Sequence, residues 1–279
     1  MAIEIAQLPS EIVVNPKEYL HLIHGDAGIG KTTWCSQIDG HYFAKCEEGA
    51  KGVQVFGSTI TSWDEFREMC SLIVAQKELN WKDVRQIDVI IVDTLDRLFD
   101  YCGQWVSKNV AFMDKGTAKK YDRIENVPWG KGYAEVRERI LDIVKKLMSY
   151  GFGVILLAHT KERTVKWRGQ ELTSFDLSIS PTSAQEFVGA CDAVGYATAE
   201  EIVERDATTG EINSVETGRW IYWQKAFLRE AKHRLRNFPE RTPLNNDVAK
   251  GPLGYTSYAK TFYDCAIAES KGVQVVTPE

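Results

Sequence analysis

The chain has 279 residues, of which 44% are hydrophobic and 26% are charged, and its formal net charge at pH 7 is -5. This length predicts a folded protein with one large domain and a sizeable core. No run approaches the roughly 18 apolar residues of a membrane span, and acidic residues stand near the N-terminus where a signal peptide needs positive charge, so we expect a cytoplasmic protein without membrane contact. The acidic net charge gives no overall support for a nucleic-acid partner.

The cysteines are scattered without C-x-x-C spacing, which argues against a zinc site and against a disulfide framework. We expect them to be reduced and mostly structural. They are Cys35, Cys46, Cys70, Cys102, Cys191 and Cys265.

The string GDAGIGKTT lies between an apolar run at Tyr19–Ile23 and a stretch that can start a helix. It matches G-x-x-x-x-G-K-[ST], the pattern of a phosphate-binding P-loop between a strand and a helix. Glycines let main-chain amides surround phosphate oxygens, Lys31 can reach the β- and γ-phosphates, and the Thr32 hydroxyl can bind Mg²⁺. We therefore predict an ATP and Mg²⁺ site. Its loop residues are Gly25, Asp26, Ala27, Gly28, Ile29, Gly30, Lys31, Thr32 and Thr33.

Strand-like and helix-like segments alternate along the chain, which predicts an α/β fold with a mainly parallel central sheet flanked by helices. The expected strands are Tyr19–His24, His41–Cys46, Asp88–Val92 and Val154–Ala158, and the expected helices are Lys31–Ile38, Trp63–Gln76, Leu95–Val106 and Tyr133–Met148. The polar segment 159–181 is too long for an ordinary connection, so we expect a functional or mobile loop. Later strand-like pieces predict a C-terminal antiparallel, hairpin-rich extension. They are Ala193–Thr198, Arg219–Gln224 and Phe227–Ala231.

The apolar strand DVIIVD ends at Asp93, as in the Walker B arrangement that holds Mg²⁺ in P-loop NTPases. Helix-forming residues follow, so Asp93 could also cap a helix, and both roles can coexist. Because Thr94 rather than a glutamate comes next, the base must come from elsewhere. Glu47 and Glu48 end the strand HYFAKC, which we expect beside the P-loop strand. Successive strand side chains face opposite ways, so only one faces the nucleotide, and we favour Glu47.

The strings GDAGIGKTT, FAKCEEG, DVIIVDTLD, WGKGY, VILLAHTKER and CDAVGYAT, in this order, resemble bacteriophage RecA-like P-loop ATPases, which are grouped with single-strand annealing recombinases. The resemblance covers approximately residues 18–240. It implies a RecA-like core, ATP hydrolysis with Mg²⁺, and annealing or strand exchange on single-stranded DNA in phage recombination or replication, in the host cell cytoplasm. A single-strand binding protein is a further implied partner.

The same resemblance implies roles for three further residues. His159 follows the strand VILLA, where RecA-like ATPases carry a polar residue that contacts the γ-phosphate and links it to a DNA-binding loop. The string AKHRLRNFP resembles the K-x-R-x-G-P element of hexameric helicases of the DnaB type, although Phe238 replaces the glycine. Lys232 and Arg234, two apart on an expected strand, would reach a neighbouring subunit's ATP site. This implies a homo-oligomer, a ring or a filament, with ATP at its subunit interfaces.

Two segments, 114–132 and 160–181, stand where RecA has its DNA-contacting loops. They combine basic residues with Tyr121, Trp129 and Trp167. Cations that follow phosphates and aromatic faces that stack on bases are typical of sequence-tolerant single-strand binding. The candidate DNA contacts are Lys115, Lys119, Lys120, Lys161, Arg163, Lys166, Trp167 and Arg168.

We divide the chain into an N-terminal segment at 1–18, a RecA-like ATPase domain at 19–244 and an uninformative tail at 245–279. The predicted function is a Mg²⁺-dependent ATPase that oligomerises and acts on single-stranded DNA. Two alternatives stay open: a RecA-like helicase motor or loader, and a nucleotide-gated regulatory or assembly module that does not bind DNA. A small-molecule P-loop kinase is less favoured, because it does not need the basic strand near Arg234.

Overall fold

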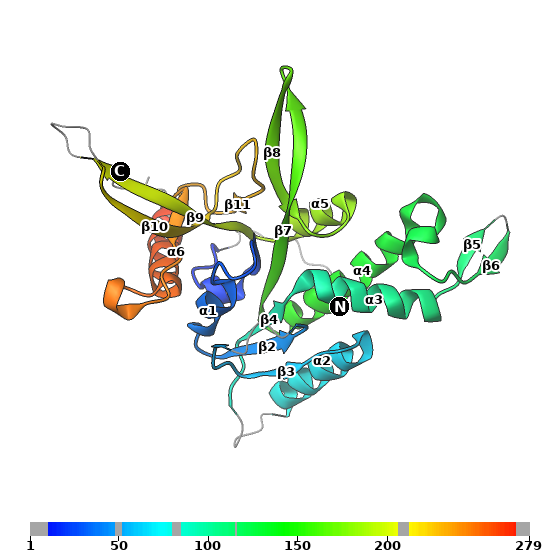
Figure 1. Ribbon diagram of the computed structural model, residues 1–279. Coiled ribbons are helices and arrows are strands. Elements are labelled where there is room, and N and C mark those ends of the chain that lie inside the picture. Colours follow the sequence, from blue (N-terminus) through cyan, green and yellow to red (C-terminus); the bar gives the residue numbers. More distant parts are fainter. Residues whose placement is uncertain (1–10, 48–51, 80–84, 115, 206–211, 272–279) are drawn as a thin grey trace.

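The structure is a computed structural model that describes residues 11–47, 52–79, 85–114, 116–205 and 212–271. A central sheet is covered by helices on both faces, and hairpins extend from the body of the protein (Figure 1). The helices are α1 (Lys31–Ser36), α2 (Trp63–Glu78), α3 (Leu95–Asn109), α4 (Lys131–Ser149), α5 (Pro181–Ala190) and α6 (Gly254–Ser270). The strands are β1 (Leu20–Gly25), β2 (His41–Lys45), β3 (Gly57–Thr59), β4 (Val89–Asp93), β5 (Phe112–Asp114), β6 (Thr117–Lys119), β7 (Gly153–Trp167), β8 (Gln170–Leu177), β9 (Ala193–Arg205), β10 (Ile212–Tyr222), β11 (Lys232–His233) and β12 (Arg241–Pro243).

The strand order of the main sheet is β12-β10-β9-β1-β7-β4-β2-β3. The pairs from β9 to β3 are parallel, whereas β10 and β12 are antiparallel additions. Every residue of β1 and of β4 is buried, as expected for parallel strands with helices on both faces. The predicted α/β fold with an antiparallel extension is confirmed.

One expected neighbour is wrong. The strand β2 pairs with β4 and not with the P-loop strand β1, because β7 lies between β1 and β4. An apolar run marks a strand as buried, but it does not say which strand lies beside it. All of these parallel strands nevertheless end at the same edge of the sheet, so the residues that follow them still converge.

The two faces of the sheet bury separate cores. Leu22 of β1 packs into a cluster with residues of α2, α3, α4 and α5. The next residue, Ile23, faces the other way and packs into a cluster with residues of α1 and α6, as the alternation of strand side chains requires. Tyr258 and Phe262 of α6 are fully buried in this second cluster. The region set apart as a tail therefore contributes a helix to the core.

The segment expected as a loop from His159 to Pro181 is a hairpin instead. The strand β7 continues outward beyond the sheet and returns as β8, with Thr160 opposite Leu177 and Trp167 opposite Gln170. Arg168 and Gly169 have φ values of 50° and 81°, so the turn has positive φ at both central residues, as tight hairpins prefer. The polar composition was misleading because both faces of this hairpin meet solvent.

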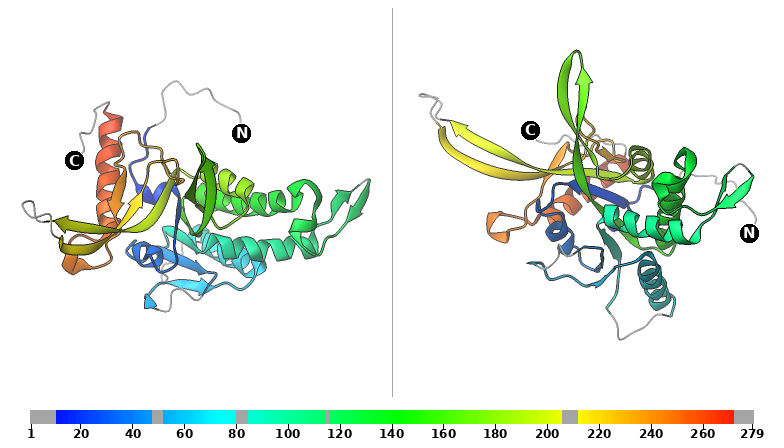
Figure 2. Two further views of the ribbon diagram at one scale, coloured as in Figure 1. Left: turned by 45° about the horizontal axis from the view of Figure 1, so that its top comes forward. Right: turned by 45° about the vertical axis from the view of Figure 1, so that its right-hand side comes forward.

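The antiparallel extension is longer than predicted in one place and shorter in another. The hairpin β9–β10 pairs residues 196–205 with 212–222. The expected strand at Phe227–Ala231 does not form, and only isolated bridges occur there, at Ala226 and Arg229. Figures 1 and 2 show the hairpins β5–β6, β7–β8 and β9–β10 leaving the body in separate directions. Across the described residues, no helix has the length and apolar character needed to cross a bilayer.

Candidate functional site

The glycine loop joins β1 to α1 as the sequence predicts. Gly28 and Gly30 adopt φ values of 78° and 112°, conformations that other residues rarely tolerate. Gly25 is needed for a different reason, since a Cβ there would lie 2.3 Å from the Ala197 carbonyl oxygen of β9. Gly30 is the N-cap residue of α1 and has no side chain that could accept a hydrogen bond from the first-turn amides, so these amides face the loop. Such a loop is a cradle for phosphate oxygens.

Lys31 lies inside this loop. Its side chain is almost fully buried, and its Nζ donates hydrogen bonds of 2.8 Å to the carbonyl oxygens of Gly25 and Asp26. Burial lowers the pKa of this ammonium, while the carboxylates of Asp93 and its neighbours oppose that shift. Because both of these hydrogen bonds go to neutral carbonyls, the ammonium is well suited to exchange them for phosphate oxygens.

Thr32 of α1 and Asp93 of β4 meet although β1, which leads into α1, is not adjacent to β4 in the sheet. The Thr32 hydroxyl donates a hydrogen bond of 2.8 Å to Asp93 Oδ2, and Asp93 is 5% exposed. Burial raises the pKa of this carboxyl group. Thr94, and not Asp93, is the N-cap residue of α3.

These oxygens fit Mg²⁺ provided that phosphates share the ion. Nowhere in the described part of the chain do three or more His, Cys, Asp or Glu side chains form a metal-binding group. Mg²⁺ in nucleotide sites, however, is held by one or two carboxylates, water and the substrate's phosphates. Thr32 and Asp93 supply hard oxygens of this kind beside the phosphate cradle.

Three interacting side chains, Glu47, His159 and Asp96, lie beside the Thr32–Asp93 pair. His159 Nδ1 is 3.0 Å from Asp96 Oδ2, and its backbone amide donates to Asp96 Oδ1 at 3.1 Å. On the other side of the ring, His159 Nε2 is 3.6 Å from Glu47 Oε1. His159 stands opposite Gly25 in the sheet register, and Cys46, just before Glu47, donates its amide to the Asp93 carbonyl. The carboxyl ends of four strands thus bring these groups to the P-loop.

The titration behaviour of the three groups is coupled. The hydrogen bond to Asp96 raises the pKa of His159, against the effect of its burial. Burial alone would raise the pKa of Asp96, but the bonds that His159 donates outweigh it, and the pKa of Asp96 is lowered. Burial raises the pKa of Glu47, and His159 partly offsets this. The ring therefore favours its charged form between two carboxylates.

Asp96 was missed as a site residue. Its only signal was its place three residues after Asp93 in DVIIVDTLD, on the first turn of α3, and nothing in the sequence tied it to His159. Glu48 lies outside the described residues, so the preference for Glu47 over Glu48 stays a prediction.

Lys232 and Arg234 are not near the P-loop of their own chain. The strand β11 pairs with Ala193 and Val194, at the end of β9 opposite to the P-loop edge. Lys232 Nζ donates to carbonyl oxygens at the end of α5, and Arg234 forms an ion pair of 2.6 Å with Asp192. The expectation that both lie on one strand is wrong, because β11 ends before Arg234.

The candidate DNA contacts fall on two separate protrusions. Lys119 ends β6 and Lys120 follows it, with Lys120 Nζ bonded to the Lys108 carbonyl. The remaining contacts lie along β7 and the turn of the hairpin β7–β8. They are Lys161, Arg163, Lys166, Trp167 and Arg168. Lys115 lies outside the described residues.

An aromatic residue that the sequence did not single out lies beside the hairpin tip. The Phe227 ring is 5.8 Å from the Trp167 ring, and both side chains are exposed, at 65% and 45%. The Arg168 guanidinium covers the Trp167 ring at 4.5 Å. This places two exposed rings and a cation at one tip.

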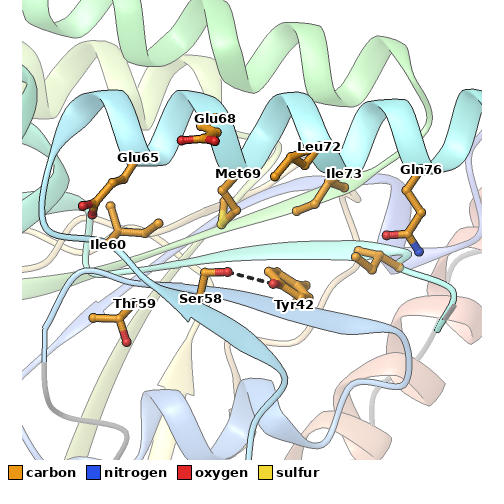
Figure 3. Close-up of a pocket in the computed structure, with 11 residues that line it drawn as sticks. Tyr42, Ser58, Thr59, Ile60, Glu65, Glu68, Met69, Leu72, Ile73 and Gln76 are labelled. Carbon is orange, nitrogen blue, oxygen red and sulfur yellow. Dashed lines mark hydrogen bonds between the residues drawn. The ribbon is translucent and has the colours of Figure 1, made fainter.

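A cleft of about 330 Å³ lies between α2 and the edge of the sheet. Figure 3 shows the residues that line it. Its floor is apolar, with Met69 and Ile73, and Glu65 and Glu68 lie along its rim. On the sheet side of the cleft, Tyr42 and Ser58 share a hydrogen bond of 2.8 Å. Its lining includes none of the residues predicted for the nucleotide site.

One of the comparisons with known proteins, the family match, covers the P-loop. A family described as an AAA domain matches residues 17–235. Among solved structures, a KaiC-like protein from the hyperthermophilic archaeon Pyrococcus horikoshii OT3 is 14% identical over 82% of this chain and 86% of that chain, with a TM-score of 0.41. No curated protein sequence matches the chain. Because the family match spans most of the chain and includes the P-loop, Asp93 and His159, the protein belongs to this family of AAA domains.

Proposed function

We propose that the protein is a Mg²⁺-dependent ATPase that oligomerises and acts on single-stranded DNA. The observation that carries the ATPase is the cluster at one sheet edge, where Lys31 and the Thr32–Asp93 pair lie beside the chain Glu47–His159–Asp96. A phosphate cradle, a pair of hard oxygens and an oriented carboxylate are the parts that phosphoryl transfer to water requires.

Each residue has a distinct part in the proposed reaction. The loop amides bind the β- and γ-phosphates, and Lys31 leaves its carbonyl partners to bind the same oxygens. Thr32 and Asp93 hold Mg²⁺, which neutralises charge on the phosphates when it is bound. Glu47 orients the attacking water and takes its proton, which its raised pKa favours.

His159 has the role of a link between the site and the outer hairpin. It contacts Glu47 and Asp96 at the point where β7 leaves the sheet and continues toward Trp167. If a change at the γ-phosphate moves Glu47, then His159, which is part of strand β7, loses its contact with Glu47. This supports a coupling between nucleotide state and whatever the hairpin binds.

We propose that Lys232 and Arg234 act on a neighbouring subunit. Their position at the far end of the sheet supports this, since the cations cannot serve their own P-loop, and the Arg234 side chain is 56% exposed. An arginine that reaches a neighbour's phosphates stabilises charge in the transition state. ATP would then be hydrolysed at interfaces of a ring or filament.

The partner proposed for the hairpin β7–β8 is single-stranded DNA, in recombination or replication of a phage. The exposed rings of Trp167 and Phe227 with the Arg168 cation support it, since base stacking and cations near phosphates are what such binding uses. Annealing or strand exchange is the activity proposed for the assembled protein.

The test measures ATP hydrolysis by the purified protein with and without a single-stranded oligonucleotide, at 50 and 200 mM salt. We expect stimulation that weakens with salt, and about tenfold weaker DNA binding by Trp167→Ala. Tyr263→Ala is the matched control, because Tyr263 is an exposed ring on α6. If the rate of ATP hydrolysis does not change when the oligonucleotide is added, the nucleotide-gated module is favoured. If the protein unwinds DNA strands, the helicase is favoured.

A further inference from the structure

A polar cleft of about 900 Å³ lies next to the P-loop, between β10 and the segment that follows β12. This volume is within the range of small-molecule sites, roughly 300–1,000 Å³. The hydrolytic residues described above do not line it. The lining residues that matter for its chemistry are Thr217, Arg219, Leu244, Asn246 and Asp247.

The cleft is tied directly to the phosphate loop. Asn246 Nδ2 donates to the Gly30 carbonyl at 3.3 Å, and Asn246 Oδ1 accepts a bond of 2.9 Å from Gln37 at the end of α1. From the opposite wall, Arg219 Nη1 lies 3.5 Å from the Ile29 carbonyl. A Cβ on Gly30 would be 2.4 Å from Asn246 Nδ2, so the wall of the cleft touches the loop itself.

The strand order orients a bound nucleotide. Asp93, Glu47 and His159 come from strands on one side of β1, whereas β9 and β10 lie on its other side. A γ-phosphate must lie toward Asp93 to be hydrolysed. The nucleoside end of the same molecule then extends toward β9 and β10, where the cleft lies.

The side chains in the cleft suit a base and a ribose. Within the described residues, the Arg219 guanidinium is held only weakly, because its hydrogen bond to the Ile29 carbonyl is long, at 3.5 Å. A planar guanidinium of this kind stacks on aromatic rings. Leu244 supplies apolar contact, and Asp247 supplies a carboxylate acceptor for ribose hydroxyls.

We infer that this cleft is the nucleoside subsite of the P-loop, with Arg219 stacked on the base and Asn246 as the positioning residue that holds the cleft wall against Gly30. The inference rests on the proposed ATPase function. It goes further in naming the part of the chain that distinguishes a nucleoside triphosphate from a bare triphosphate chain.

The test compares binding of Mg²⁺-ATP and of Mg²⁺ with inorganic tripolyphosphate by calorimetry. Arg219→Ala is expected to weaken ATP binding at least about fivefold and to change tripolyphosphate binding less than twofold, because only ATP has a base to stack. Thr217→Trp, which fills the cleft from an exposed strand position, should exclude ATP and keep tripolyphosphate. Arg236→Ala is the control, since Arg236 is 89% exposed and lies outside the cleft.

The possible outcomes separate this inference from the proposed function. Equal losses for both ligands in Arg219→Ala would show a charge effect and overturn the nucleoside subsite. ATP binding by Thr217→Trp at the affinity of the unchanged protein would overturn it as well. If the unchanged protein binds neither ligand, the proposed ATPase function itself fails.

Discussion

Replacing Asp96 by Asn tests the part of the site that the sequence did not indicate. Asp96→Asn keeps an oxygen for the His159 backbone amide but replaces the charged partner of the ring. A hydrogen bond to a charged group contributes roughly 1.5–3 kcal/mol. Because both side chains are partly exposed, at 26% for His159 and 15% for Asp96, we expect about 1–2 kcal/mol here.

The pH dependence of this loss follows from the directions of the two shifts. The lowered pKa of Asp96 gives stability that is present above its ordinary pKa, about 3.9, and is lost as pH falls through the lowered value. The raised pKa of His159 gives stability that is complete below its ordinary pKa, about 6.5, and is lost as pH rises through the raised value. The pair therefore contributes most between about pH 4 and 6.5.

The assay is urea unfolding at pH 5.5 and pH 9. The difference in unfolding free energy between the unchanged protein and Asp96→Asn should be larger at pH 5.5 than at pH 9. Asp100→Asn, one turn along α3 in an exposed pair with Arg97, is the control and should change stability by less than about 1 kcal/mol at both values. A difference for Asp96→Asn that is equal at both pH values, or larger at pH 9, would refute the reasoning.

Three further predictions concern the loop, the C-terminal helix and the subunit interface. Gly30 has a φ of 112°, and a Cβ there would meet Asn246, so Gly30→Ala should lower the unfolding free energy by about 1–3 kcal/mol and weaken ATP binding. An unchanged urea midpoint would contradict this. Phe262→Ala, in the fully buried face of α6, should cost about 3–5 kcal/mol, and a loss under 1 kcal/mol would mean that α6 is not part of the core. Mixing Lys31→Ala with Arg234→Ala subunits should restore ATP hydrolysis that neither has alone, whereas no gain on mixing would argue against a shared site.

The sequence indicated the P-loop and Asp93 because their chemistry is local. The glycines, Lys31 and Thr32 must follow one another along a strand, a turn and a helix, so spacing alone carries the information. The burial of β1 and β4 was similarly readable from their apolar runs.

What the sequence did not indicate depends on contacts between distant segments. The pairing of β2 with β4, and the meeting of Asp96 with His159, depend on strand order, which a hydrophobic pattern does not encode. The hairpin β7–β8 is polar on both faces, so it lacks the alternation that reveals a half-buried strand. The aromatic residues of α6 gave no signal because no motif accompanied them.

The most direct test of the central claim is Mg²⁺-dependent release of phosphate from ATP by the purified protein and by Lys31→Ala, each shown to be folded by circular dichroism. The account predicts that the unchanged protein hydrolyses ATP and stops when Mg²⁺ is chelated. It predicts no hydrolysis by Lys31→Ala, because the variant lacks the ammonium that bonds to the loop carbonyls and then to the phosphates. Hydrolysis by folded Lys31→Ala at the rate of the unchanged protein would contradict the account.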